Sequence, residues 1–101
     1  DFTYIEDLIQ GVFKIIENDN AKNEIFNITY GEGRAINIMA EIVKDHFPKI
    51  NIDYKPKDGL TPDRGTLSIA KAKKLLDYKP SFPLEIGYKK YIDWYSKLQG
   101  I

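Results

Sequence analysis

Residues 68–80 read Ser-Ile-Ala-Lys-Ala-Lys-Lys-Leu-Leu-Asp-Tyr-Lys-Pro, and the six residues before them read Pro-Asp-Arg-Gly-Thr-Leu. Ser68 is of a type that caps helix N-termini, so a short basic helix is predicted from there to about Leu76. Arg64 precedes this helix in a loop rich in proline and glycine. An arginine on such a loop suits a phosphate, because its planar fork can bond two oxygens at once. The inward face of the helix is expected to contain Ile69, Ala72, Leu75 and Leu76.

Three further helices are predicted from apolar residues that recur at helical spacing, at residues 4–18, 36–47 and 83–99. Thr3 and Glu6 have the spacing of a capping box, which would begin the first of these helices. The last helix carries aromatic side chains whose spacing predicts that most of them belong to the core. They are Tyr88, Tyr91, Trp94 and Tyr95.

Two short strands are predicted between the helices, at residues 25–30 and 50–54, where β-branched and aromatic residues are frequent. The predicted fold class is therefore α/β, as a small α+β lobe of helices with two short strands. Two short strands cannot form a stable sheet alone. They would either pack on the helices or complete a sheet elsewhere in a larger protein.

Length and composition restrict the possible function classes. The chain has 101 residues, which fits one domain, and no cysteine, which removes disulfides, thiolate nucleophiles and cysteine-held metals. The net charge of zero argues against a general nucleic-acid binder, and no apolar run approaches the roughly 20 residues of a membrane span. No nucleic acid and no membrane are therefore expected as partners, and a cytoplasmic location is expected. Because the first residue is Asp1 rather than methionine, we expect a fragment.

No catalytic or metal-binding group is predicted. The only histidine, His46, is expected at a helix end, and metal ligation would need three or four converging groups. Glu6 and Asp7 are adjacent in a first helical turn, where acids interact favourably with the helix dipole, and this role is favoured over a catalytic pair. Residues 31–33, Gly-Glu-Gly, lack the longer pattern of a dinucleotide-binding loop and are interpreted as a turn.

Cations are concentrated in the loop that contains Arg64. Lys55 and Lys57 lie in the same loop, and the three side chains would together neutralise a diphosphate. A solvated lysine-rich loop is the alternative interpretation for Lys55 and Lys57. Phe2 and Tyr4 precede the first helix, and they would either staple its start or face a ligand.

Four stretches carry motifs in a defined order. Residues 1–8 read Asp-Phe-Thr-Tyr-Ile-Glu-Asp-Leu, residues 27–31 contain Asn-Ile and a glycine, and residues 62–80 contain the arginine loop and basic helix. Residues 84–95 contain Leu-Glu-x-Gly and Ile-x-Trp-Tyr. In order and spacing, the set resembles the C-terminal part of extended short-chain dehydrogenase/reductases, the NAD-dependent nucleotide-sugar epimerases and dehydratases. Ser68, Ala70 and Tyr78 stand where the family usually has aspartate, serine and tryptophan.

The resemblance implies that residues 1–101 are the C-terminal nucleotide-sugar-binding domain of a Rossmann-type enzyme. In such enzymes an N-terminal Rossmann domain holds NAD and the catalytic Tyr-x-x-x-Lys pair, so this fragment would bind no cofactor and would be inactive alone. By motif position, Arg64 matches an arginine that holds the diphosphate, and Lys55 takes the place of another. The implied ligand is a nucleotide-diphosphate sugar, and the implied partner is the missing Rossmann domain. The parent would be a homodimeric isomerase or lyase of polysaccharide biosynthesis.

Two other functions are compatible with the residues. The chain could be a stand-alone protein-interaction module without catalytic activity, or a reductase-like lobe that has lost catalysis. The coding sequence upstream of Asp1 distinguishes the first of these from an enzyme. A glycine-rich strand-turn-helix and a Tyr-x-x-x-Lys motif there would support the enzyme.

Overall fold

A computed structural model describes all 101 residues, and every regular element in it is helical. The four predicted α-helices are confirmed, with ends that differ from the predictions by no more than two residues. The elements are α1 (Ile5–Glu17), the 3-10 turn η1 (Asp19–Ala21), α2 (Ile36–His46), α3 (Ala70–Leu76) and α4 (Leu84–Gln99). The Ser68 hydroxyl accepts a hydrogen bond from the Ala70 backbone N–H at 3.3 Å, but Ile69 rather than Ser68 is the N-cap residue of α3, and its side chain provides no cap.

The predicted strands at residues 25–30 and 50–54 do not form, so the α/β fold class is wrong. A strand needs a neighbouring backbone to satisfy its N–H and C=O groups. In the first segment, side chains take that role: the Thr3 hydroxyl accepts from the Tyr30 N–H at 3.1 Å, and the Tyr78 hydroxyl donates to the Thr29 carbonyl at 2.9 Å. The first of these bonds also engages the hydroxyl that was predicted to cap α1. That helix has no side-chain cap.

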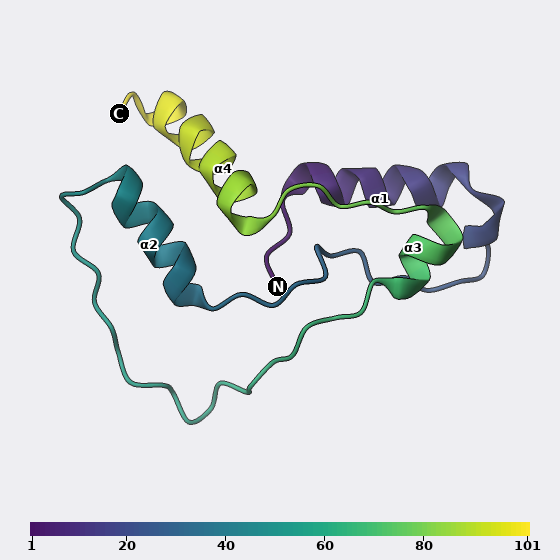
Figure 1. Cartoon of the computed structure of the whole chain (residues 1–101), viewed down its shortest axis with the longest axis horizontal. Coiled ribbons are helices and arrows are strands. Elements are labelled where there is room, and N and C mark those ends of the chain that lie inside the picture. Colours follow the sequence, from purple (N-terminus) through teal and green to yellow (C-terminus); the bar gives the residue numbers. More distant parts are fainter.

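The helices associate as two pairs in a flat molecule that measures 50 × 38 × 17 Å. α1 packs against α3 and η1, and α2 packs against α4 (Figure 1). A long segment without helix, residues 47–69, connects the two pairs and sweeps away from both of them (Figure 1). No helix in this structure combines the length and apolar character that crossing a membrane requires.

The main core lies where α1, α3 and residues 26–28 meet. Ile69, Ala72 and Leu76 are buried there as predicted, and Tyr78 joins them with no exposed surface. Gly11 permits the close approach of α1, because a Cβ atom at this position would lie 2.3 Å from Ile28 Cγ2. The partly buried side chains around this core are Ile15, Ala21, Phe26 and Ile28.

The aromatic side chains of α4 are not core residues, which corrects a second prediction. Trp94 is 54% exposed, and Tyr91 and Tyr95 are also exposed. They pack mainly on one another along the helix, with ring centroids 5.7 Å apart for Tyr91 and Trp94. Helical spacing correctly placed these side chains on one face, but α2 covers only part of that face.

Candidate functional site

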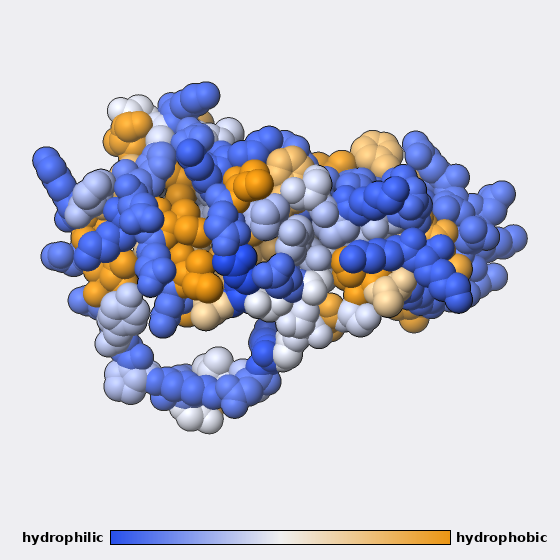
Figure 2. Space-filling view, in the orientation of Figure 1, coloured by the Kyte–Doolittle hydropathy of each residue, from blue (hydrophilic) through white to orange (hydrophobic).

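The three predicted phosphate-binding cations all lie on the long segment between α2 and α3. Lys55, Lys57 and Arg64 are exposed. Lys57 forms an ion pair with Asp63, whereas Arg64 makes no hydrogen bond or ion pair within the chain. Figure 2 shows the segment as an arch of hydrophilic and neutral residues that stands away from the body of the molecule. The structure therefore leaves Arg64 free to contact an anion, but it does not bring the three cations into a pocket.

The arch has one local turn of its own. The Asp58 carboxylate accepts a hydrogen bond from the Leu60 N–H at 2.8 Å, and the Asp58 carbonyl accepts from the Thr61 N–H at 3.2 Å. Residues 51–54, by contrast, take part in no backbone–backbone hydrogen bond. At the end of the arch, Asn27 Nδ2 donates to the Ser68 carbonyl at 3.1 Å, and Ile69 is buried in the core. Between residues 48 and 65, the hydrogen bonds and the ion pair of the arch are all short-range.

Phe2 and Tyr4 lie apart from the arch, in the wall of an apolar cavity. The cavity has a volume of about 320 Å³ and lies between the N-terminal segment, α2 and α4. Hydrophobic residues are visible between α2 and α4 in Figure 2. The remaining wall residues are Thr3, Ile5, Met39, Phe82, Pro83, Leu84, Gly87, Tyr88 and Tyr91. No residue of the arch lines this cavity, so the two groups of predicted binding residues do not share one pocket.

Tyr4 is held in this wall by aromatic and cationic neighbours. Its ring lies 5.0 Å from the Phe82 ring, centroid to centroid. The Lys90 ammonium lies 4.8 Å from the centre of the Phe82 ring and 3.5 Å from a Glu6 carboxylate oxygen. Cation–π contact and ion pairing thus fix Lys90 beside Tyr4 and Phe82. The sequence contains no indication of this role for Lys90, because Tyr4 and Glu6 lie 86 and 84 positions away in the chain.

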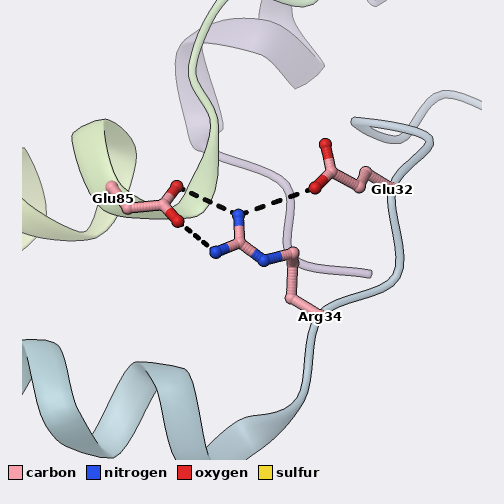
Figure 3. Close-up of polar contacts among 3 residues, drawn as sticks. All are labelled: Glu32, Arg34 and Glu85. Carbon is pink, nitrogen blue, oxygen red and sulfur yellow. Dashed lines mark hydrogen bonds and ion pairs between the residues drawn. The ribbon is translucent and has the colours of Figure 1, made fainter.

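Arg34 lies between two carboxylates, those of Glu85 and Glu32. Its guanidinium binds both carboxylate oxygens of Glu85, with the Nη1–Oε2 distance at 3.0 Å, and lies 3.7 Å from Glu32 (Figure 3). The hydrogen bond from Arg34 is the main cause that lowers the pKa of Glu85 to about 2, and the same bond raises the pKa of Arg34. The contact ties the turn before α2 to the first turn of α4. No role was predicted for Arg34 from the sequence. No local sequence pattern indicates Glu85, 51 positions away, as its partner.

A second polar cluster, which we call the α1 junction, joins α1 to residues 79–82. Asp7 is 1% exposed, and its two carboxylate oxygens accept from the Ser81 and Phe82 N–H groups at 2.8 and 2.9 Å. The Gln10 side chain accepts from the Lys79 N–H at 2.8 Å and donates to the Lys79 carbonyl at 2.7 Å. Asp7 therefore anchors a backbone segment, and both of its oxygens are engaged.

The remaining ionisable groups do not assemble into a catalytic set. No three or more His, Asp or Glu side chains converge in a metal-binding arrangement. His46 lies at the end of α2, as expected, with Nε2 4.0 Å from an Asp93 oxygen. Tyr78 is fully buried, and this burial, with a smaller effect from Asp7, raises its pKa to about 12. Because it is buried and donates to the Thr29 carbonyl, Tyr78 acts as a structural group.

The Gly31–Gly33 turn does not fit the phosphates of NAD. The Gly31 N–H already donates to the Asp1 carboxylate at 3.1 Å, and Glu32 adds a negative charge beside it. A Cβ atom at Gly33 would lie 2.3 Å from the Thr66 hydroxyl oxygen, so a side chain already occupies that space. An anion would meet two carboxylates here instead of free N–H groups.

Comparisons with known proteins relate almost the whole chain to nucleotide-sugar enzymes. UDP-glucuronate 4-epimerase 1 of Arabidopsis thaliana is 28% identical over 99% of the chain, and UDP-glucuronic acid decarboxylase 1 of Danio rerio is 31% identical over 95%. An uncharacterized protein of Methanocaldococcus jannaschii is 31% identical over 94%. The chain spans 27%, 23% and 29% of the lengths of these three proteins, respectively.

Two further comparisons gave no match. No family model matches the chain, and no solved structure resembles it at a significant level. Similarity to the named relatives is thus what bears on the function of the chain. Several of them, at 26–31% identity, are epimerases or decarboxylases of UDP-sugars.

Proposed function

We propose that the chain is the C-terminal, nucleotide-sugar-binding part of an NAD-dependent epimerase, decarboxylase or dehydratase. The observation that carries the proposal is the similarity of nearly the full chain to two enzymes named for UDP-glucuronate chemistry. In this proposal, NAD and the catalytic residues belong to a Rossmann domain outside these 101 residues. The glycine turn of the chain does not fit the cofactor, so the chain contributes to substrate binding alone.

Arg64 is the principal ligand-binding residue in this proposal. It is exposed, and no acid within the chain neutralises it, so its five N–H donors are free for the diphosphate. Lys55 and Lys57 are weaker contributors, because a lysine provides a point charge rather than a fork and because Lys57 already pairs with Asp63. The arch would bend toward the cleft between the two domains when the ligand binds.

Phe2 and Tyr4 have a separate role in the proposal. They line the apolar cavity, so they suit an uncharged portion of the ligand better than its phosphates. The alternative, that they only fix the start of α1, is also supported by the Tyr4–Phe82 contact. Tyr4→Ala in the intact protein distinguishes these two roles. If Tyr4 contacts the ligand, the variant should bind the nucleotide sugar more weakly at an unchanged free energy of unfolding. If Tyr4 has a purely structural role, the free energy of unfolding should fall.

The experiment that tests the proposal is Arg64→Ala in the full-length protein, with binding of UDP-glucuronate and UDP-glucose measured by calorimetry. Hydrogen bonds to charged groups contribute about 1.5–3 kcal/mol, so affinity should fall roughly 10- to 150-fold. Lys97→Ala is the matched control, because Lys97 is an exposed cation in the last turn of α4, and it should leave affinity unchanged. Equal affinities for wild type and Arg64→Ala would remove Arg64 from the site.

The competing proposal is a protein-interaction module without catalytic activity. It is favoured by the many large apolar side chains that the chain exposes, which include Ile16, Ile36 and Leu60. The reading frame upstream of Asp1 decides between the two proposals. A frame that encodes no nucleotide-binding domain would support the module.

A further inference from the structure

The outer face of α1 carries an apolar stripe whose side chains the chain leaves 39–72% exposed. Phe13 is 56% exposed and Ile16 is 72% exposed. Every member of the stripe is exposed, although the helical spacing of these residues is typical of a core-facing surface. The outer face of α1 consists of Ile5, Leu8, Ile9, Val12, Phe13 and Ile16.

The rotation of α1 about its axis is fixed by the opposite face. Asp7 and Gly11 are the two buried residues of the helix, and Gln10 lies beside them. Asp7 and Gln10 hold residues 79–82 by four hydrogen bonds, and Gly11 contacts Ile28. The helix cannot turn its apolar stripe inward without breaking these contacts, so the stripe stays exposed within residues 1–101.

We propose that the outer face of α1 docks on the nucleotide-binding domain of the same protein, an inference that rests on the proposed function. Three of the relatives are three to four times longer than this chain, so in them most of the protein lies outside the matched region. None of the six stripe residues is charged, so the complementary surface is apolar as well. It is formed by aliphatic side chains of the larger domain.

The size of the stripe favours a covalently attached domain over a second copy of the chain. A 13-residue helix is about 20 Å long, which is short for the roughly 800 Å² that each partner of a stable free complex buries. A domain in the same chain is present at a millimolar effective concentration, so a smaller contact is sufficient. The α1 junction and the outer face of α1 would then make α1 a layer between the two domains.

Thiol labelling of the full-length protein tests this inference. Ile9→Cys and Ile16→Cys each place a small, weakly polar group on the stripe, and residues 1–101 contain no cysteine of their own. Lys44→Cys is the matched control on an exposed part of α2. Reaction rates with a maleimide reagent, assigned to each site by peptide mass spectrometry, are compared in native protein and in urea.

If the outer face of α1 is covered, both stripe cysteines should react at least about 100-fold more slowly in native protein than in urea, while the control slows by less than about 10-fold. Native rates equal to the control would overturn the inference. Protection that disappears on dilution of the protein would also overturn it, in favour of a second copy. UDP-glucuronate binding, measured on the same samples, tests the proposed function separately: binding with unprotected cysteines refutes only the docking.

Discussion

The α1 junction and the arch of residues 47–69 hold their conformations in different ways. At the α1 junction, the buried Asp7 and the Gln10 side chain satisfy backbone groups 69 to 75 positions away in the chain. In the arch between residues 48 and 65, the bonds of Asp58 and the ion pair of Lys57 all span six residues or fewer, and the one long-range bond, from Asn27 to the Ser68 carbonyl, lies at its end. The arch carries the predicted ligand-binding cations, and its conformation is therefore less constrained by the rest of the chain than that of the α1 junction.

The largest expected effect compares a leucine of the core, to which the α1 junction is joined, with a leucine of the arch. Leu76 is 1% exposed in the core, whereas Leu60 is 91% exposed in the arch. Leu76→Ala should lower the free energy of unfolding by about 2–5 kcal/mol, because it leaves a cavity, and Leu60→Ala should change it by less than about 0.5 kcal/mol. Urea denaturation followed by circular dichroism measures both. Similar losses would mean that the arch packs against the body of the molecule.

The next prediction tests the α1 junction itself. Asp7→Ala leaves the Ser81 and Phe82 N–H groups without their partner, so it should cost about 3 kcal/mol of unfolding free energy. Glu6→Ala is the control in the same helical turn, and it should cost less than about 1 kcal/mol because Glu6 is exposed. If the two variants unfold at the same urea concentration, Asp7 is not an anchor.

Tyr78 gives a pH-dependent test of the core. Its pKa is raised to about 12 in the folded protein, from about 10 in an unfolded chain, because burial disfavours the phenolate. The unfolded state therefore loses its proton first, and stability should fall by about 2 kcal/mol as the pH rises from about 10 to 12. Tyr78→Phe should remove this part of the pH profile, at a cost of about 1 kcal/mol at neutral pH for the lost bond to Thr29. A profile identical to that of wild type would show that another group causes the alkaline loss.

The smallest expected effect concerns the pair of Arg34, which is partly buried, and Glu85, which is exposed. The pKa of Glu85 is lowered to about 2, so the stability it contributes is present above about pH 4.5 and is lost as the pH falls through 2. Glu85→Gln should flatten that part of the acid denaturation curve, and added salt should weaken the contribution in wild type. Arg34→Gln should have the same effect, and the double variant should add nothing to either. Additive effects would mean that the two residues do not act as a pair.

The helices could be read from the sequence because their signals are local. Pro48 follows the end of α2, and apolar spacing gave the extent of α1 and α4 to within two residues. The prediction of strands was wrong because residues 25–30 and 50–54 have side chains typical of strands but no partner strand in this chain. β-propensity describes a fit to a sheet, and the sheet itself is a tertiary feature.

The candidate site was predictable in part. The sequence placed Lys55, Lys57 and Arg64 in one long loop, and the structure has all three exposed on a segment without helix or strand. The partners of Arg34 and Lys90 were not predictable, since ion pairs with Glu85 and Glu6 across 51 and 84 positions leave no local pattern. Whether the arch binds a diphosphate stays a prediction.

By itself, the sequence determined the positions of the four helices and the amphipathic character of α1, because helical periodicity and caps act over three or four residues. Only the tertiary structure decided which face of α1 points inward. The buried carboxylate of Asp7 binds two distant N–H groups, Gly11 admits Ile28 and Ile15 packs on the core, so this face of α1 is inside and the longer apolar stripe is outside. An exposed apolar face indicates that a partner binds there, but the face alone does not identify the surface of that partner.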